Sequence, residues 1–286
     1  MDILQLLLYG VVLGSIVALG AVGVTLTFGI LGFANFAHGD LMAFGAYVAL
    51  VAYTWLALPL WLALPAAVAA TVALALLVDA LVFRRFRTRR PIVLLISSFG
   101  VALILRSLIQ IGFGPGTVLY STRIQIAERF WGLRVKPDQI VIVALTLVLV
   151  VLLHLFLSRT RTGKAMRAMA DNPTLARLSG IDTENVIRWT WAIGGALAAV
   201  AGVCLGLNSR LSPEMGWFLL LAVFAAAILG GIGRPYGAIL GGYVVGICVE
   251  MSNLVLPAEY SPVVPFALLV VMLIVRPTGL FAGRSG

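Results

Sequence analysis

The sequence predicts an all-α membrane protein, a polytopic helix bundle of eight or nine spans with broken or re-entrant helices. Of the 286 residues, 62% are hydrophobic and 11% are charged, and the mean hydropathy is +1.09. A soluble globule needs far more polar surface than this composition supplies. The net charge of +9 lies in short clusters between apolar runs, so it indicates orientation in a bilayer rather than nucleic-acid binding.

Nine apolar runs approach the roughly 20 residues that a spanning helix needs. They cover residues 3–31, 41–57, 60–83, 92–112, 139–158, 184–207, 217–232, 236–256 and 262–276. The first is long enough to include an interfacial or re-entrant piece, and only Gly233, Arg234 and Pro235 separate 217–232 from 236–256. We therefore expect eight or nine crossings in a single transmembrane domain over 1–286, with a cytoplasmic segment at 159–182.

Three basic clusters orient the chain. They are Arg84, Arg85, Arg87, Arg89 and Arg90; then Arg159, Arg161, Lys164, Arg167 and Arg177; and finally Arg276 and Arg284. The positive-inside rule puts all three in the cytoplasm, which agrees with nine crossings and an external N-terminus. The loop at 113–138 is then external, although it carries Arg123, Arg129, Arg134 and Lys136 against the rule.

Small residues recur at the spacing that lets membrane helices approach closely. The G-x-x-x-G pairs are Gly10/Gly14, Gly202/Gly206, Gly237/Gly241 and Gly242/Gly246. Packing within one chain is the favoured use, and a subunit interface is the alternative. The pattern Ile-Leu-Gly at 30–32, followed by Gly39, also repeats at 228–230 and Gly237, and each copy is expected where one helix ends and another begins.

Four ionisable residues lie inside apolar runs, where they are costly and usually face a cavity or a partner: Asp79, Arg106, His154 and Glu250. Asp79 and His154 are near cytoplasmic ends, so snorkelling or local pairing is expected for both. Arg106 and Glu250 are expected to lie deeper in the membrane, further from the ends of their spans. Opposite charges in separate spans could pair, and a structural ion pair is at least as plausible there as a substrate site.

The stretch Asn35-Phe36-Ala37-His38-Gly39-Asp40 places polar groups between two apolar runs. It predicts either a connecting loop or an unwound segment that lines a pathway, since irregular backbone at membrane depth is tolerated beside water or protein. Ser97 and Ser98 in the fourth run could add hydroxyls to the same path. The candidate pathway residues are Asn35, His38, Ser97, Ser98 and Glu250.

The basic island RTRTGKAMRAMADNPTLARLSGID, at Arg159–Asp182, predicts a helix, a break and a second helix. Asn172 suits the N-cap, Pro173 the first helical position and Gly180 the C′ position of a two-turn helix at 173–179. Asp182 can cap the next run. A solvated basic loop and a docking element for a soluble partner are both compatible with this pattern.

Several chemistries have no signature in the sequence. The only Gly-Lys dipeptide, Gly163-Lys164, is not part of a phosphate-binding loop, and the motifs of zinc proteases and serine hydrolases are missing. His38 and His154 are too few for a metal site. The chain is therefore expected to be neither an ATPase nor another enzyme, and to hold no metal or cofactor of its own.

The chain resembles the permease subunits of the high-affinity branched-chain amino acid ABC importers, specifically the shorter of two paralogous permeases. The resemblance covers nearly the whole length. Its most specific parts are GSIVALGAVGVTLTFGILGFANFAHGDLMAFGAYVA at Gly14–Ala49, GKAMRAMADNPTLARLSGID at Gly163–Asp182, and VRPTGLF at 275–281. The segment 163–182 keeps the alanine-rich helix and the glycine of the family's coupling loop, but it has no glutamate at its start.

The resemblance implies an importer of the inner membrane that translocates branched-chain or related amino acids. The implied partners are a second, paralogous permease, two cytoplasmic ATPase subunits that bind ATP and Mg, and an extracytoplasmic binding protein, with 113–138, 208–216 and 257–261 as its candidate docking surfaces. The residues implied to couple to the ATPase are Lys164, Arg167, Pro173, Leu175, Arg177, Leu178 and Gly180. Alternatives are an importer for urea, amides or aromatic or other carboxylic acids, and a self-sufficient secondary transporter or channel that uses Glu250 or Asp79 as an ion site.

Overall fold

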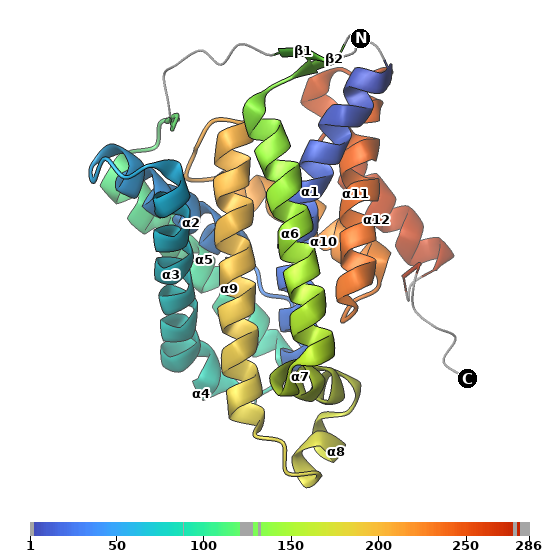
Figure 1. Ribbon diagram of the computed structural model, residues 1–286. Helices are drawn as coiled ribbons and strands as arrows, with labels where there is room; N and C mark the ends of the chain where they lie inside the picture. The colour runs from blue at the N-terminus through green and yellow to red at the C-terminus, as the bar shows by residue number, and fades with distance from the viewer. Residues whose placement is uncertain (1–2, 88, 121–127, 131–132, 277–278, 281–286) are drawn as a thin grey trace.

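The computed structural model describes residues 3–87, 89–120, 128–130, 133–276 and 279–280. Almost all of them form a bundle of roughly parallel and antiparallel helices (Figure 1). The helices are α1 Ile3–Leu31, α2 Ala37–Thr54, α3 Leu60–Val78, α4 Arg84–Phe86, α5 Pro91–Phe113, α6 Pro137–Arg159, α7 Arg161–Asp171, α8 Pro173–Leu178, α9 Thr183–Asn208, α10 Met215–Gly230, α11 Pro235–Ser252 and α12 Val263–Val275. A π-helical turn, Asp79–Phe83, joins α3 to α4, and a 3₁₀ turn, Ala258–Tyr260, precedes α12.

All nine predicted apolar runs fold as helices, and the predicted all-α membrane bundle is confirmed in its class. Within the described residues, five helices are long and apolar enough to cross a bilayer: α1, the continuous α3–α4 unit, α5, α6 and α9. The expected eight or nine crossings are therefore not confirmed. The other apolar helices are shorter or more polar, because α10 and α12 span 16 and 13 residues and α2 carries His38 and Asp40 in its first turn.

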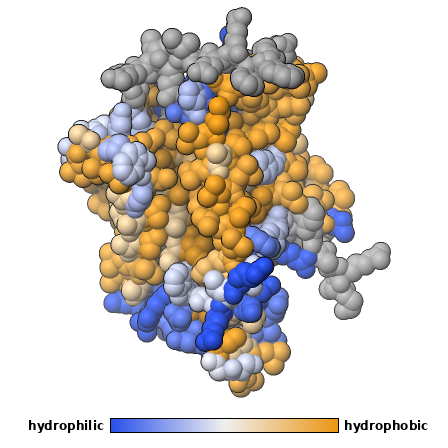
Figure 2. Space-filling view, in the orientation of Figure 1, coloured by the Kyte–Doolittle hydropathy of each residue, from blue (hydrophilic) through white to orange (hydrophobic). Residues whose placement is uncertain are grey.

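Two helices form the centre of the bundle. In α1 and α9 the most apolar window is 72% buried, whereas the corresponding windows of α3–α4, α5 and α6 are 22% to 33% buried. The helices α3–α4, α5 and α6 therefore lie on the outside with exposed apolar faces, and α1 and α9 are covered by other helices of the same chain. Figure 2 shows the result as a broad apolar belt on the side of the molecule.

The ends of the bundle differ in charge, as the positive-inside rule predicts. The basic residues of α4, α7 and α8 gather at the lower end in Figures 1 and 2. Arg276 belongs to the same end, since Leu280 N donates a 2.9 Å hydrogen bond to Leu229 O near the end of α10. Arg123 and Arg284 lie outside the described residues.

A short β-hairpin at the opposite end was not predicted. Strands β1 Glu128–Phe130 and β2 Leu133–Val135 pair antiparallel, with Arg129 opposite Arg134. The amide of Gln5, at the start of α1, donates to Arg134 O at 2.9 Å and accepts from Arg134 N at 2.8 Å. This two-way bond holds the hairpin over the end of α1 that is predicted to be external.

The predicted glycine pairs all pack within the chain. A Cβ added to Gly10 or Gly14 of α1 would lie 2.8 Å from the Cα of Ile247 or Tyr243 of α11, so the two backbones are in direct contact. Gly202 of α9 similarly touches the backbone of Met42 in α2. Such contacts replace the hydrophobic driving force that lipid does not supply between helices.

Both Ile-Leu-Gly patterns mark helix breaks, as predicted. The first lies at the end of α1, where Gly32 has a φ of +72° that only glycine adopts without strain. The second forms the last three residues of α10, and α11 begins at Pro235. At the first break the chain folds back into the bundle, because His38 of α2 packs against Gly23 of α1. Gly23 lies eight residues before the last residue of α1, so at a rise of 1.5 Å per residue α2 begins about 12 Å back along α1 from its end.

The α1–α11 contact gives a direct test of the packing. Gly14→Leu forces a side chain into the backbone of α11 and is expected to lower the free energy of unfolding by about 1–3 kcal/mol. The matched control is Gly112→Leu, because an added Cβ at Gly112 in α5 meets nothing within 4 Å. The apparent melting temperature of each purified variant in detergent is the measurement, and equal losses in the two variants would contradict the packing argument.

Candidate functional site

The basic island forms two helices separated by a one-residue break, as predicted. Thr160 caps α7 by accepting from Gly163 N at 2.9 Å, and Asn172 caps α8 by accepting from Thr174 N and Leu175 N at 3.1 and 3.0 Å. Gly180 follows α8 with a φ of +81°. These local bonds make α8 a short helix with a defined start and stop rather than a loose loop.

One helix of this segment is anchored to the bundle and the other projects from it. Met166 and Met169 of α7 are buried, whereas α8 protrudes below α7 at the end of the molecule (Figure 1). All seven residues expected to couple to a partner are exposed: Lys164, Arg167, Pro173, Leu175, Arg177, Leu178 and Gly180. Leu175 and Leu178 are 59% and 79% exposed, which makes an apolar tip in a basic surround.

An ionic cluster joins the start of α9, which follows the projecting helix in the chain, to the end of α3. Asp182 caps α9 by accepting from Asn185 N at 3.1 Å, and Glu184, in the first turn of α9, accepts from Arg87 Nη1 at 2.8 Å. Arg87 also pairs with Asp79 at the π-helical turn, and Arg84 lies 3.7 Å from Glu184. The side chains of Arg87 and Asp79 are 15% and 7% exposed. The expected local pairing of Asp79 is therefore present, and it links the start of α9 to the end of α3.

The break between α1 and α2 brings three of the predicted pathway residues together. Asn35 Oδ1 accepts from Ala37 N at 3.1 Å, and Ser98 Oγ of α5 accepts from Phe36 N at 3.0 Å. His38 is fully inside the bundle against Gly23. Among the described residues, Asn35 Nδ2 and His38 Nε2 are buried without a hydrogen-bond partner.

A buried ion pair stands one turn beyond this break. Arg106 of α5 donates from Nε to Asp40 Oδ1 and from Nη2 to Asp40 Oδ2, each at 3.1 Å. Its guanidinium carbon lies 4.9 Å from the ring centroid of Trp217 in α10. Of the two interpretations that the sequence leaves open for Arg106, an ion pair across helices is present, and its partner is Asp40. In the sequence Asp40 belongs to the polar stretch between two apolar runs, and only the fold of α2 carries it to Arg106.

The remaining predicted pathway residues lie elsewhere. Ser97 donates to Val93 O in its own helix at 2.7 Å. Glu250 is near the end of α11, not deep in a span, and accepts from Asn253 Nδ2 at 3.4 Å. His154 is exposed and its Nδ1 lies 2.9 Å from the hydroxyl of Tyr236. The structure therefore does not bring Ser97 or Glu250 to the cluster at Asn35.

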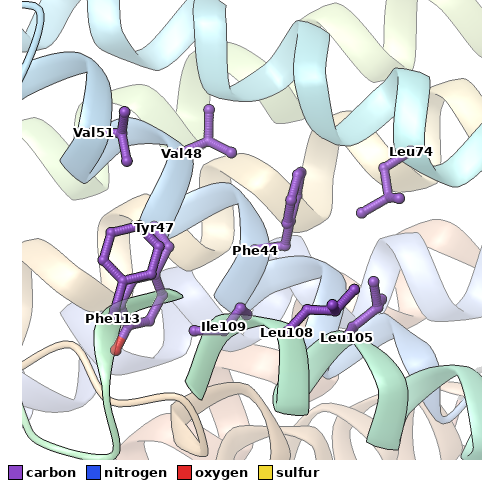
Figure 3. Close-up of a pocket in the computed structure, with 9 residues that line it drawn as sticks. All are labelled: Phe44, Tyr47, Val48, Val51, Leu74, Leu105, Leu108, Ile109 and Phe113. Atoms are coloured by element: carbon purple, nitrogen blue, oxygen red, sulfur yellow. The ribbon is translucent and has the colours of Figure 1, made fainter. Parts of the chain in front are cut away.

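A groove of about 280 Å³ opens between α2, α3 and α5 (Figure 3). Its lining is almost entirely apolar and consists of Phe44, Tyr47, Val48, Val51, Leu74, Leu105, Leu108, Ile109 and Phe113. The rings of Tyr47 and Phe113 lie with their centroids 4.8 Å apart at one end. Such a lining suits a hydrocarbon chain better than a zwitterion, since it offers no charged group to orient a ligand.

Comparisons with known proteins agree with this architecture. Residues 6–273 match the family described as "Branched-chain amino acid transport system / permease component". The chain is 35% identical to the high-affinity branched-chain amino acid transport system permease protein LivH of Escherichia coli strain K12, over 97% of this chain and 94% of that protein. It is 30% identical to the permease protein LivM of the same system and strain, over 54% of this chain and 37% of LivM. Among solved structures, PsaBC from Streptococcus pneumoniae in complex with Fab has a similar fold, with a TM-score of 0.54, 13% identity, and coverage of 98% of this chain and 94% of that one.

The ionic cluster yields a test that separates buried from exposed charges. Arg87→Ala leaves the buried carboxylate of Asp79 without its cation and is expected to cost about 3–5 kcal/mol of stability. Arg84→Ala removes a charge whose side chain is 59% exposed and is expected to cost less than about 1 kcal/mol. Thermal unfolding of both variants in detergent is the measurement, and an Arg84 variant as unstable as the Arg87 variant is inconsistent with the assigned roles.

Proposed function

The chain belongs to the branched-chain amino acid transport permease family, and we propose that it is the membrane subunit of an ATP-driven importer for branched-chain or related amino acids. It is a multi-pass integral protein of the bacterial inner membrane. Its own role is to form a translocation path, while binding and hydrolysis of ATP with Mg belong to separate subunits. This division is supported by a sequence without nucleotide-binding motifs and by an exposed docking helix at the basic end.

The observation that carries the proposal is the projecting helix α8. Ala176 is the one side chain of α8 that is buried within the described residues, whereas Leu175 and Leu178 are mostly exposed and do not belong to the core. Exposed leucines in a segment that also exposes Lys164, Arg167 and Arg177 match the anatomy of a small docking site, in which an apolar anchor enters a groove and basic groups meet an acidic rim. We propose that the partner whose groove receives the two leucines is a cytoplasmic ATPase.

The connection from α8 into the membrane suits mechanical coupling. Only Ser179–Asp182 separates α8 from α9, and the capped start of α9 is held to the end of α3 by Glu184 and Arg87. A displacement of α8 would therefore move the central helix α9 and the outer helix α3 together. Rocking of whole helices around such a hinge is a usual way to alternate access in transporters.

The complete importer in this proposal contains further proteins. A second permease of the LivM type would face this chain across the path, two ATPase subunits would occupy the basic end, and an extracytoplasmic binding protein would deliver the amino acid to the opposite end. The single permease domain covers 1–286, with its coupling segment at 159–182. We keep Asn35, His38 and Ser98 as proposed pathway residues, which is supported by the hydrogen bonds of Asn35 and Ser98 to the backbone at the break before α2.

Replacement of both tip leucines tests the docking role. The variant Leu175→Asp/Leu178→Asp is expected to lose co-purification of the ATPase and substrate-stimulated ATP hydrolysis by at least about tenfold, because two carboxylates would enter an apolar groove. Leu256→Asp, at an exposed leucine near the opposite end of the bundle, is the control and is expected to assemble normally. Unchanged assembly and ATP hydrolysis in the double variant would refute the docking role of α8.

A further inference from the structure

A cluster of aromatic side chains reaches the Asp40–Arg106 pair through Trp217, on a face that the described part of the chain leaves partly uncovered. Phe36 lies with its ring centroid 6.4 Å from Phe99, 6.3 Å from Trp217 and 5.3 Å from Phe224. Phe99 is 41% exposed, and Phe36, Trp217 and Phe224 are half-buried. Phe36, just before α2, thus forms one aromatic patch with residues of α5 and α10 beside a guanidinium.

Arg106 is only partly used by its own chain. Asp40 takes the edge of the guanidinium formed by Nε and Nη2. No hydrogen bond from Nη1 to any described residue is present, and the side chain keeps 15% of its exposure, so the edge formed by Nη1 and Nη2 is open. A guanidinium is planar and has five N–H donors. One of its edges can therefore hold Asp40 while the other edge binds a second carboxylate in bidentate geometry.

The position of Arg106 argues against a merely lipid-facing role. It lies about two turns inside the end of α5, a spanning helix, where an exposed charge costs several kcal/mol unless it meets a partner or a water-filled path. Asp40 and Trp217 hold the guanidinium in place, which is a preorganised arrangement for a ligand.

The backbone around the pair adds a further electrostatic bias. Gly39 of α2 and Gly216 of α10 touch backbone to backbone, so the N-terminal ends of both helices meet beside Arg106 and Trp217. Helix N-termini carry partial positive charge, and paired helix starts near the bilayer midplane are a recurring way to hold a substrate carboxylate. Arg106 and Asp40 cancel in formal charge, which leaves the surroundings favourable to an anion.

We propose that the open edge of Arg106, with the patch of Phe36, Phe99, Trp217 and Phe224, is a substrate site on the translocation path. It would bind an α-amino acid with an apolar side chain, the carboxylate on the guanidinium and the hydrocarbon side chain on the rings. This inference rests on the proposed transport function and gives it a place in the fold. Asp40 acts as a positioning residue, since it orients Arg106 and does not contact the ligand.

The test uses the assembled importer with its second permease, ATPases and binding protein in proteoliposomes, with L-leucine as the probe. The readout is leucine taken up per ATP hydrolysed at saturating binding protein. Arg106→Lys keeps a cation for Asp40 but has no second edge, and Asp40→Asn/Arg106→Gln removes both charges so that neither remains buried alone. Both are expected to assemble normally and to lose at least about tenfold in uptake per ATP, the value of a charged hydrogen-bonded contact.

The aromatic part has its own matched pair. Phe99→Ala is expected to reduce uptake per ATP several-fold, whereas Phe218→Ala, at a 66% exposed ring next to Trp217 but outside the patch, is expected to match the wild type. Wild-type uptake in the Arg106→Lys variant would overturn the site, because it would mean that the ion pair serves the fold alone. Loss of the second permease from the Phe99 variant would overturn it as well, in favour of a subunit contact. Failure of the wild-type complex to take up leucine would contradict the proposed function itself.

Discussion

The direct contact between helix backbones is the constraint on which the rest of the structure depends. Lipid gives helices no hydrophobic reason to associate, so stability must come from close packing, and close packing requires small residues at the crossing points. Gly10 and Gly14 let α11 lie against the central helix α1, Gly202 lets α9 touch α2, and Gly39 meets Gly216. These crossings fix the positions of the helix starts, and the helix starts carry the polar residues.

Once the helices are fixed, the charged residues fall into two groups with different duties. At the basic end, Asp79, Arg87 and Glu184 join α3 to α9 beside the projecting helix α8. In the middle of the bundle, Asp40 and Arg106 join α2 to α5 beside the aromatic patch. Both clusters link α2 or α3 with a neighbour, and α2 and α3 pack on the same central helix, α9. A push at α8 can therefore reach the middle of the bundle through rigid helices, which is what an importer driven from the cytoplasm requires.

The features predicted well from the sequence are those that depend on short stretches of chain. Each apolar run became a helix, and the Asn172, Pro173 and Gly180 signals gave the start and stop of α8 within a residue. The features predicted poorly depend on pairs that are distant in sequence. Glu250 was placed deep in a span, yet it lies at the end of α11, and the β1–β2 hairpin was not expected. A three-residue strand has too little pattern of its own to be recognised without its partner.

By itself, the sequence determined the membrane class, the helical segments and the capped helix at the basic end, because hydropathy and capping act between residues close in the chain. Only the tertiary structure decided which charges meet. Asp40 and Arg106 are brought together by the return of the chain into the bundle after Gly32, and Trp217 reaches them through the contact of Gly39 with Gly216. Attraction between two charges depends on distance in space, which helix packing sets and sequence spacing does not.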